Sequence, residues 1–125
     1  MYLFDTHTLL WMSHRPEALP PRVQRIIFEG EFSASVVSYW ELTDLSFSRR
    51  PPVDNPETWW RRYVMAHDIP VISLEPDHIT AEGRLPQHHR DPFDRMLVAQ
   101  AQVEKLVMVT RDSAVAKYVV RTAWR

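Results

Sequence analysis

Apolar and polar positions alternate along this chain in blocks that predict short strands followed by helices. Five apolar segments have the length of strands, namely Tyr2–Phe4, Phe32–Ser35, Pro70–Leu74, Leu106–Thr110 and a last one near Tyr118–Val120. Helical spacing predicts helices between them at Thr6–Met12, Arg22–Glu29, about Val36–Phe47, after Asn55, Glu75–Leu85, from Pro92 to about Val103, and briefly from Ser113. Strands and helices therefore follow one another over the whole chain.

Local signals mark where these helices begin and end. Asp5 or Thr6 is placed to cap the first helix, and Pro20-Pro21 opens the second, which Gly30 is placed to end. Asn55-Pro56 is a cap and first-turn pair for a helix with apolar residues at Trp59, Trp60, Tyr63 and Val64. In the helix from Val36, the side chains expected near one face are Val36, Val37, Trp40 and Phe47.

This alternation predicts an α/β fold, a three-layer α/β/α sandwich with a central, mainly parallel sheet of about five short strands. Leu106–Thr110 is a continuous apolar run, typical of a strand covered on both faces, and the helix from Pro92 is apolar over most of its circumference. No internal repeat or linker is visible, so residues 1–125 are expected to form one domain.

Composition narrows the class of protein. The chain has no cysteine, which excludes disulfides and thiolate metal sites and agrees with a reducing compartment. No apolar run approaches the roughly 20 residues of a membrane span, and the N-terminal segment does not resemble a signal peptide. A cytoplasmic location is expected. The net charge is −1, so attraction to phosphate has to come from local charge; the thirteen arginines against two lysines suit a phosphodiester weakly, and a GC-rich genome explains the ratio as well.

Four acidic residues stand where the chain turns or enters a helix, and each has an ordinary structural explanation. Asp5 and Asp112 are each placed to cap a helix, and Glu41 follows Ser38 at capping-box spacing. Asp94 suits the positive end of a helix dipole, while Asp91, directly before Pro92, is expected to be a structural cap. No single one of these acids indicates chemistry.

The positions of the four acids taken together, however, do indicate chemistry. Asp5 and Asp112 lie just beyond strands whose carboxyl ends a parallel sheet aligns, the edge where open α/β sheets bind ligands. Were Glu41 and Asp94 to point to the same crevice, four carboxylates would repel one another unless a cation held them. Oxygen ligands without cysteine suit Mg²⁺ or Mn²⁺, which orients water and offsets phosphodiester charge.

Four motifs in this order resemble the PIN domain family, and in particular the VapC-type toxins of bacterial toxin–antitoxin pairs. They are Asp5-Thr6-His7 after a strand, Trp40-Glu41-Leu42, the run from His89 to Arg95, and Val109–Asp112, with Trp124 also in keeping. The resemblance covers nearly the whole length. The segments Thr43-Asp44 and Ser46–Arg50 depart from the usual family pattern.

The resemblance implies a Mg²⁺- or Mn²⁺-dependent endoribonuclease with Asp5, Glu41, Asp94 and Asp112 as its catalytic and metal-binding residues. It also implies a homodimer that is blocked by a small VapB-like antitoxin, with no membrane association. Thr6 and Thr110 are candidates to support the carboxylates, and Arg95 or Arg111 to meet phosphate, although a solvent-facing Arg95 is the simpler expectation. Asp44 is expected to be solvated.

Other interpretations remain beside this one. His88 and His89 are interpreted as loop residues, and Trp11, Trp40, Trp59 and Trp60 as core or a partner groove in preference to base-stacking platforms. A receiver domain is disfavoured because Arg111 follows the late strand where lysine is needed, and an aspartate phosphatase because His7 occupies the position of its second aspartate. The alternative function is a PIN-fold module that binds RNA or a partner without cutting.

Overall fold

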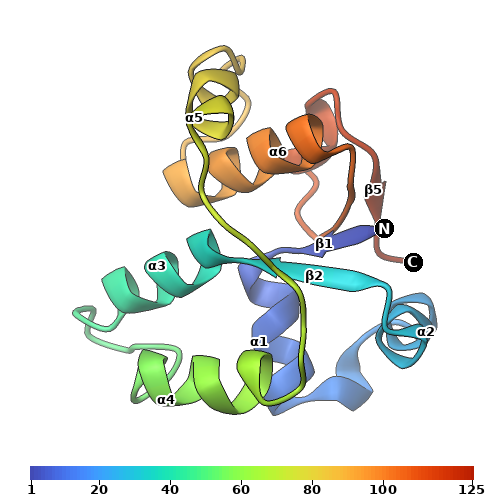
Figure 1. The fold of residues 1–125 in the computed structure, drawn as a ribbon, viewed down its shortest axis with the longest axis vertical. Coiled ribbons are helices and arrows are strands. Elements are labelled where there is room, and N and C mark those ends of the chain that lie inside the picture. The colour runs from blue at the N-terminus through green and yellow to red at the C-terminus, as the bar shows by residue number, and fades with distance from the viewer.

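A five-stranded sheet with all strands parallel runs through the centre of the computed structural model, which describes residues 1–125 (Figure 1). Its strands are β1 (Tyr2–Phe4), β2 (Phe32–Ser35), β3 (Val71–Ile72), β4 (Val107–Val109) and β5 (Thr122–Ala123). They lie in the order β3-β2-β1-β4-β5, so the N-terminal strand is the central one. The register pairs Tyr2 with both Phe32 and Val107.

Six helices connect the strands, and most begin and end at the residues that the sequence marks. They are α1 (Thr6–His14), α2 (Pro21–Glu29), α3 (Val36–Leu45), α4 (Pro56–Trp60), α5 (Pro76–Gly83) and α6 (Pro92–Glu104). Asp5, Asn55 and Asp91 cap α1, α4 and α6, and Gly30 ends α2 in the left-handed conformation at φ 74°. The helix α4 continues through a π-helical turn at Arg61–Met65, and Val115–Lys117 forms a 3₁₀ turn.

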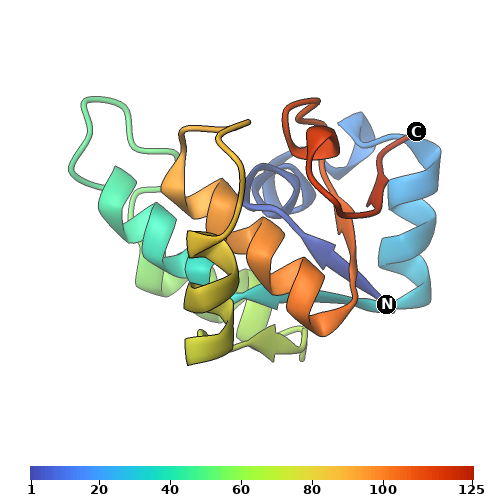
Figure 2. The same ribbon diagram turned by 90° about the horizontal axis from the view of Figure 1, so that it is seen from above.

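Helices cover both faces of the sheet, with α5 and α6 on one face and α1 and α4 on the other (Figures 1 and 2), and an apolar core lies under each set of helices. Phe4 and Val109 contribute to the core that contains side chains of α1, α2 and α4, including Trp59. Their neighbours Leu3 and Met108 contribute to the core under α5 and α6. Successive strand residues point to opposite faces, which is why the central strands β1 and β4, covered on both faces, are hydrophobic at every position. The predicted α/β/α sandwich is confirmed.

Two local predictions were wrong. The last strand is Thr122–Ala123 and not the segment near Tyr118–Val120, because Tyr118 is buried at the end of a 3₁₀ turn and its hydroxyl serves other groups. The helix α3 ends at Leu45, and only Val37 of its expected apolar face is buried. Trp40 is 55% exposed and Phe47, beyond the helix, is 88% exposed.

Parallel pairing brings the carboxyl ends of β1, β2 and β4 to one edge of the sheet. Asp5 follows β1 directly, α3 starts at the end of β2, and Asp112 lies three residues beyond Val109. The fold therefore gathers segments that are far apart in the sequence at a single edge. None of the helices combines the length and the apolar character that crossing a membrane would require.

Candidate metal centre

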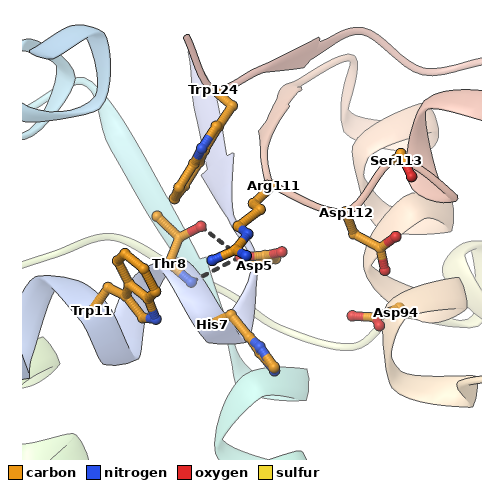
Figure 3. Close-up of a pocket in the computed structure, with 9 residues that line it drawn as sticks. All are labelled: Asp5, His7, Thr8, Trp11, Asp94, Arg111, Asp112, Ser113 and Trp124. Carbon is orange, nitrogen blue, oxygen red and sulfur yellow. Dashed lines mark hydrogen bonds between the residues drawn. The ribbon is translucent and has the colours of Figure 1, made fainter. Parts of the chain in front are cut away.

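Asp5 is a helix cap and a pocket residue at the same time. Its Oδ1 atom accepts hydrogen bonds from the backbone N–H of Thr8 at 2.9 Å and from the Thr8 hydroxyl at 2.5 Å (Figure 3). The side chain is only 6% exposed, but the residue lines a pocket of about 490 Å³. Capping uses one carboxylate oxygen and leaves the other for the pocket, so the structural and functional explanations of Asp5 do not exclude each other.

Asp94 and Asp112 line the same pocket, and their carboxylates point toward one another from α6 and from the loop after β4 (Figure 3). Asp112 Oδ1 accepts a hydrogen bond from the backbone N–H of Ala114 at 2.9 Å, and its own N–H donates to Thr110 Oγ1 at 3.0 Å. Asp112 Oδ2 and Asp94 Oδ2 are free of backbone donors. Thr110 thus fixes the loop that carries Asp112, in line with its expected supporting role.

His89 lies in the loop before α6, as expected, and its side chain joins these two acids, a contact that the sequence did not predict. Its Nε2 lies 2.8 Å from Asp112 Oδ2 and 3.2 Å from Asp94 Oδ2. Its Nδ1 accepts a hydrogen bond from the backbone N–H of Asp91 at 3.0 Å, so the proton of the neutral ring is on Nε2 and is donated to the carboxylates. His88 points elsewhere, with its ring against that of Tyr118.

Sequence patterns contain little that indicates His89. Two adjacent histidines before a helix look the same whether the loop is extended or folds back over the helix N-terminus. The available signal is the spacing of five residues from His89 to Asp94, which allows contact once Asp91-Pro92 fixes the turn into α6. Its partner Asp112 is brought close only by the sheet.

Glu41 reaches the site from α3. The side chain is 7% exposed, and its Oε1 atom is buried without a hydrogen-bond partner. It lines a neighbouring hollow of about 340 Å³ that shares His7 and Trp11 with the pocket of Asp5. Thr6, on the adjacent turn of α1, donates to Ser38 Oγ at 2.9 Å and so links the two helices beside Glu41.

The charges of these acids influence one another. Burial, and then the charges of Asp91, Glu41 and Asp5, raise the pKa of Asp94 to about 7. Burial also raises the pKa of Glu41, to which Asp91 and Asp5 add, while the Thr6 hydroxyl and His7 oppose the shift. Burial alone would raise the pKa of Asp112 too, but the Ala114 N–H and His89 outweigh it and hold that pKa below its usual range.

The donor set fits a divalent cation. Three ligand-type atoms, one each from His89, Asp94 and Asp112, lie within 4.8 Å of one another, and Asp5 faces the same pocket. A buried carboxylate oxygen without a donor, as on Glu41, costs free energy unless a cation or proton satisfies it. Oxygen ligands of this kind match Mg²⁺ or Mn²⁺.

The two arginines named beside the site differ from each other. Arg95 was expected to face solvent, but it is 7% exposed and lies against α5, with its Nε 2.9 Å from Glu82 Oε1. Its guanidinium also donates to the carbonyls of Pro86 and Leu85, so it is not available to a substrate. Arg111 is exposed and lines the pocket. Asp44 is exposed, as expected.

The four tryptophans Trp11, Trp40, Trp59 and Trp60 differ in burial and in position. Trp59 and Trp60 are buried in the core, as expected. Trp40 is exposed on α3, where it packs edge-on against Phe93. Trp11 is half-buried and lines the pocket beside Arg111.

Solved structures with the same fold come from toxin–antitoxin assemblies. The chain has a TM-score of 0.73 and 12% identity to a chain of VapBC2 from Rickettsia felis bound to a DNA fragment from the promoter, covering 99% of this chain and 98% of that one. For DNA-bound VapBC from Salmonella typhimurium the values are 0.70 and 15%, covering 98% and 96%. For a toxin–antitoxin complex from Klebsiella pneumoniae they are 0.64 and 20%, covering 98% and 96%.

Sequence comparison with curated proteins finds no match. The family model described as PIN domain, however, matches residues 2–120. That span includes Asp5, Glu41, His89, Asp94 and Asp112. The chain belongs to the PIN domain family.

Proposed function

We propose that this chain is a divalent-metal-dependent endoribonuclease and the toxin component of a VapBC-type toxin–antitoxin system. PIN domains are typically nucleases, and the chain belongs to that family. The observation that carries the proposal is the cluster itself. Asp5, Asp94 and Asp112 line one pocket, and Glu41, whose buried Oε1 is left without a donor, lines the hollow beside it.

In this proposal Asp5, Glu41, Asp94 and Asp112 hold Mg²⁺ or Mn²⁺. Such an ion, when bound, activates water for attack on a phosphodiester and offsets charge on the phosphate. Thr8 keeps one oxygen of Asp5 engaged, so the other is directed at the pocket. His89 donates its Nε2 proton toward Asp112 and Asp94 and so holds the two carboxylates at a fixed spacing.

RNA is proposed as the substrate on the strength of the resemblance to VapC-type toxins, and Arg111 supplies a cation at the mouth of the acidic pocket. The first test is cleavage of a mixed RNA panel with EDTA, Mg²⁺ or Mn²⁺. We expect metal-dependent cutting that Asp94→Asn reduces by at least roughly a hundredfold, as loss of a transition-state-stabilising group does.

The matched control is Asp44→Asn, which removes the same charge from an exposed position on α3. It should cut at the wild-type rate. Cutting that survives Asp94→Asn would contradict the metal assignment, and cutting that survives EDTA would contradict metal dependence. If no RNA is cut under any condition, the alternative of a non-cleaving RNA- or partner-binding module is favoured.

The proposed partners are a VapB-like antitoxin and a second copy of this chain. Several solved structures of the same fold are VapBC assemblies. Exposed apolar side chains beside the site, Trp40 and Phe47 among them, offer surface for a partner. We expect a small protein encoded next to this gene to co-purify with the chain and to inhibit it. Light scattering of the free chain tests the dimer.

A further inference from the structure

Two hollows meet beside the acidic cluster. The pocket of Asp5, Asp94 and Asp112 continues into a second one of about 920 Å³ that extends to Pro20 and Arg22, and the two share three lining residues, which are Trp11, Arg111 and Trp124. The shared residues come from α1, from the loop after β4 and from the residue after β5. They form the passage between the proposed metal centre and the second hollow.

The side chains of Trp11, Arg111 and Trp124 lie next to one another, with Trp11 in contact with the other two (Figure 3). The Arg111 guanidinium carbon lies 5.7 Å from the centre of the Trp11 ring, within the range of a cation–π contact. The Trp11 and Trp124 rings meet edge to face, with centroids 6.4 Å apart and planes inclined by 73°. Both indoles pack partly on the core that contains Phe4 and Leu9, so they are held in place while part of each remains at the surface.

The positive charge of Arg111 is not paired with any acidic side chain. Although it lies in a pocket with Asp5, Asp94 and Asp112, it takes part in no salt bridge of the structure and is exposed. By contrast, Arg95 is engaged by Glu82 and by loop carbonyls. A guanidinium held over an indole beside an acidic cluster, and not neutralised by that cluster, is available to an anion.

We propose that Trp11, Trp124 and Arg111 form a subsite for an unpaired nucleotide adjacent to the phosphate that is cut. The base stacks on an indole and Arg111 pairs with a backbone phosphate, which is how single strands are bound without strict sequence recognition. A base in a duplex is already stacked and cannot offer its face to these rings, so the subsite selects single-stranded segments. Because it takes RNA as the substrate, this inference rests on the proposed function.

The test measures binding separately from cleavage. Labelled single-stranded RNA is titrated by fluorescence anisotropy in EDTA against protein that carries Asp94→Asn, so that metal-dependent cutting is absent and acidic repulsion is reduced. In this background Trp11→Leu is expected to weaken binding roughly ten- to a hundredfold, while Trp11→Phe, which keeps an aromatic face, weakens it much less. Arg111→Gln is expected to lower the slope of log affinity against log salt by about 0.7.

Arg62→Gln, an exposed arginine beyond α4, and Phe28→Leu, an exposed aromatic residue on α2, are the matched controls and should bind as the background does. Arg111→Gln changes an exposed side chain, so it stays informative if Trp11→Leu fails to fold. Unchanged affinity and salt slope in both Trp11→Leu and Arg111→Gln overturn the proposal. So does loss of antitoxin binding with RNA binding intact, which would assign the hollow to a protein partner.

Failure of the subsite proposal and failure of the nuclease proposal give different results. RNA binding that depends on Trp11 and Arg111, without any cleavage by the otherwise wild-type protein, keeps the subsite and rejects the nuclease. Cleavage that depends on Asp94 but is indifferent to Trp11 and Arg111 keeps the nuclease and rejects the subsite.

Discussion

Asp94 has a charge state that depends strongly on its surroundings. Its pKa rises from an ordinary 3.8 to about 7 in the folded chain, mainly through burial. A carboxyl whose folded pKa is raised stabilises the fold below the unfolded pKa, and that contribution is lost as the pH rises through the folded value. Without metal, the free energy of unfolding should therefore fall between about pH 4 and pH 7 by up to about 1.4 kcal/mol per pH unit.

The variant Asp94→Asn should remove this dependence. At pH 8 in EDTA we expect it to be more stable than the wild type by about 2 to 4 kcal/mol, and at pH 4 to be nearly equal to it. Urea unfolding at the two pH values measures both differences, with Asp44→Asn as the control. Equal pH dependence in the wild type and in Asp94→Asn would mean that Asp94 is ionised at no cost in the folded chain.

His89 acts through its two carboxylate partners. Its Nε2 donates to Asp112 and lies 3.2 Å from Asp94, so it fixes the spacing of two proposed ligands before metal arrives. Partners of this kind typically change metal affinity ten- to a hundredfold. We expect His89→Ala to weaken Mn²⁺ binding by roughly tenfold, and His89→Gln, which keeps a donor, to weaken it less.

Calorimetric titration with Mn²⁺ reads this effect without relying on activity. His88→Ala is the matched control, because His88 packs on Tyr118 and reaches neither carboxylate. A gain in Mn²⁺ affinity in His89→Ala would indicate that His89 competes with the metal for the carboxylates, and an unchanged affinity would remove its positioning role.

Among the elements, α5 and α6 are joined by a partly buried ion pair. Arg95 on α6 binds Glu82 on α5 and the carbonyls of the connecting loop, and its guanidinium lies 3.3 Å from the Tyr118 hydroxyl. The same hydroxyl accepts the backbone N–H of His89 at 2.8 Å. The network therefore connects the packing of α5 on α6 to the loop that carries His89.

Breaking this pair should be costly. Arg95→Met keeps an apolar stem of similar length but leaves the Glu82 carboxylate and the loop carbonyls without their donor, and we expect a loss of about 3 kcal/mol in the free energy of unfolding. Arg61→Met removes the exposed pair with Glu57 and should cost less than about 1 kcal/mol. Similar losses in the two variants would show that burial does not strengthen the Arg95 pair.

The sequence predicts the strands and helices better than it predicts the contacts of individual side chains. Periodicity and caps predict the strands and most helix ends, because both are local properties that Asp5, Gly30 or Asp91 fix within a few residues. Arg95 was expected to face solvent and the contacts of His89 were not predicted, because their partners lie 13 and 23 residues away and no local pattern reports such contacts. The displaced last strand has a related cause, since Tyr118 is recruited by Arg95 and His89.

At the scale of the whole molecule, the acidic cluster exists only when the sheet is complete. Asp5, Glu41, Asp94 and Asp112 are drawn from segments that span most of the chain. A cation that binds this cluster binds the folded state alone. At a free concentration one hundred times its Kd it should raise the free energy of unfolding by about 2.7 kcal/mol.

Thermal unfolding with increasing Mn²⁺ measures this coupling. The rise in Tm should be lost in Asp5→Asn and kept in Asp44→Asn. A rise of the same size in all three proteins would point to unspecific ion binding elsewhere on the surface.

The central position of β1 in the sheet affects when the acidic cluster can assemble during synthesis. Tyr2–Phe4 is synthesised before both of its partners, and although Phe32–Ser35 follows soon after, Val107–Val109 follows only much later, so one edge of β1 stays unpaired until β4 has left the ribosome. Asp5 meets Asp112 only then. Until β4 has emerged, a nascent chain therefore carries no assembled acidic cluster, so any activity of that cluster is confined to chains whose sheet has formed.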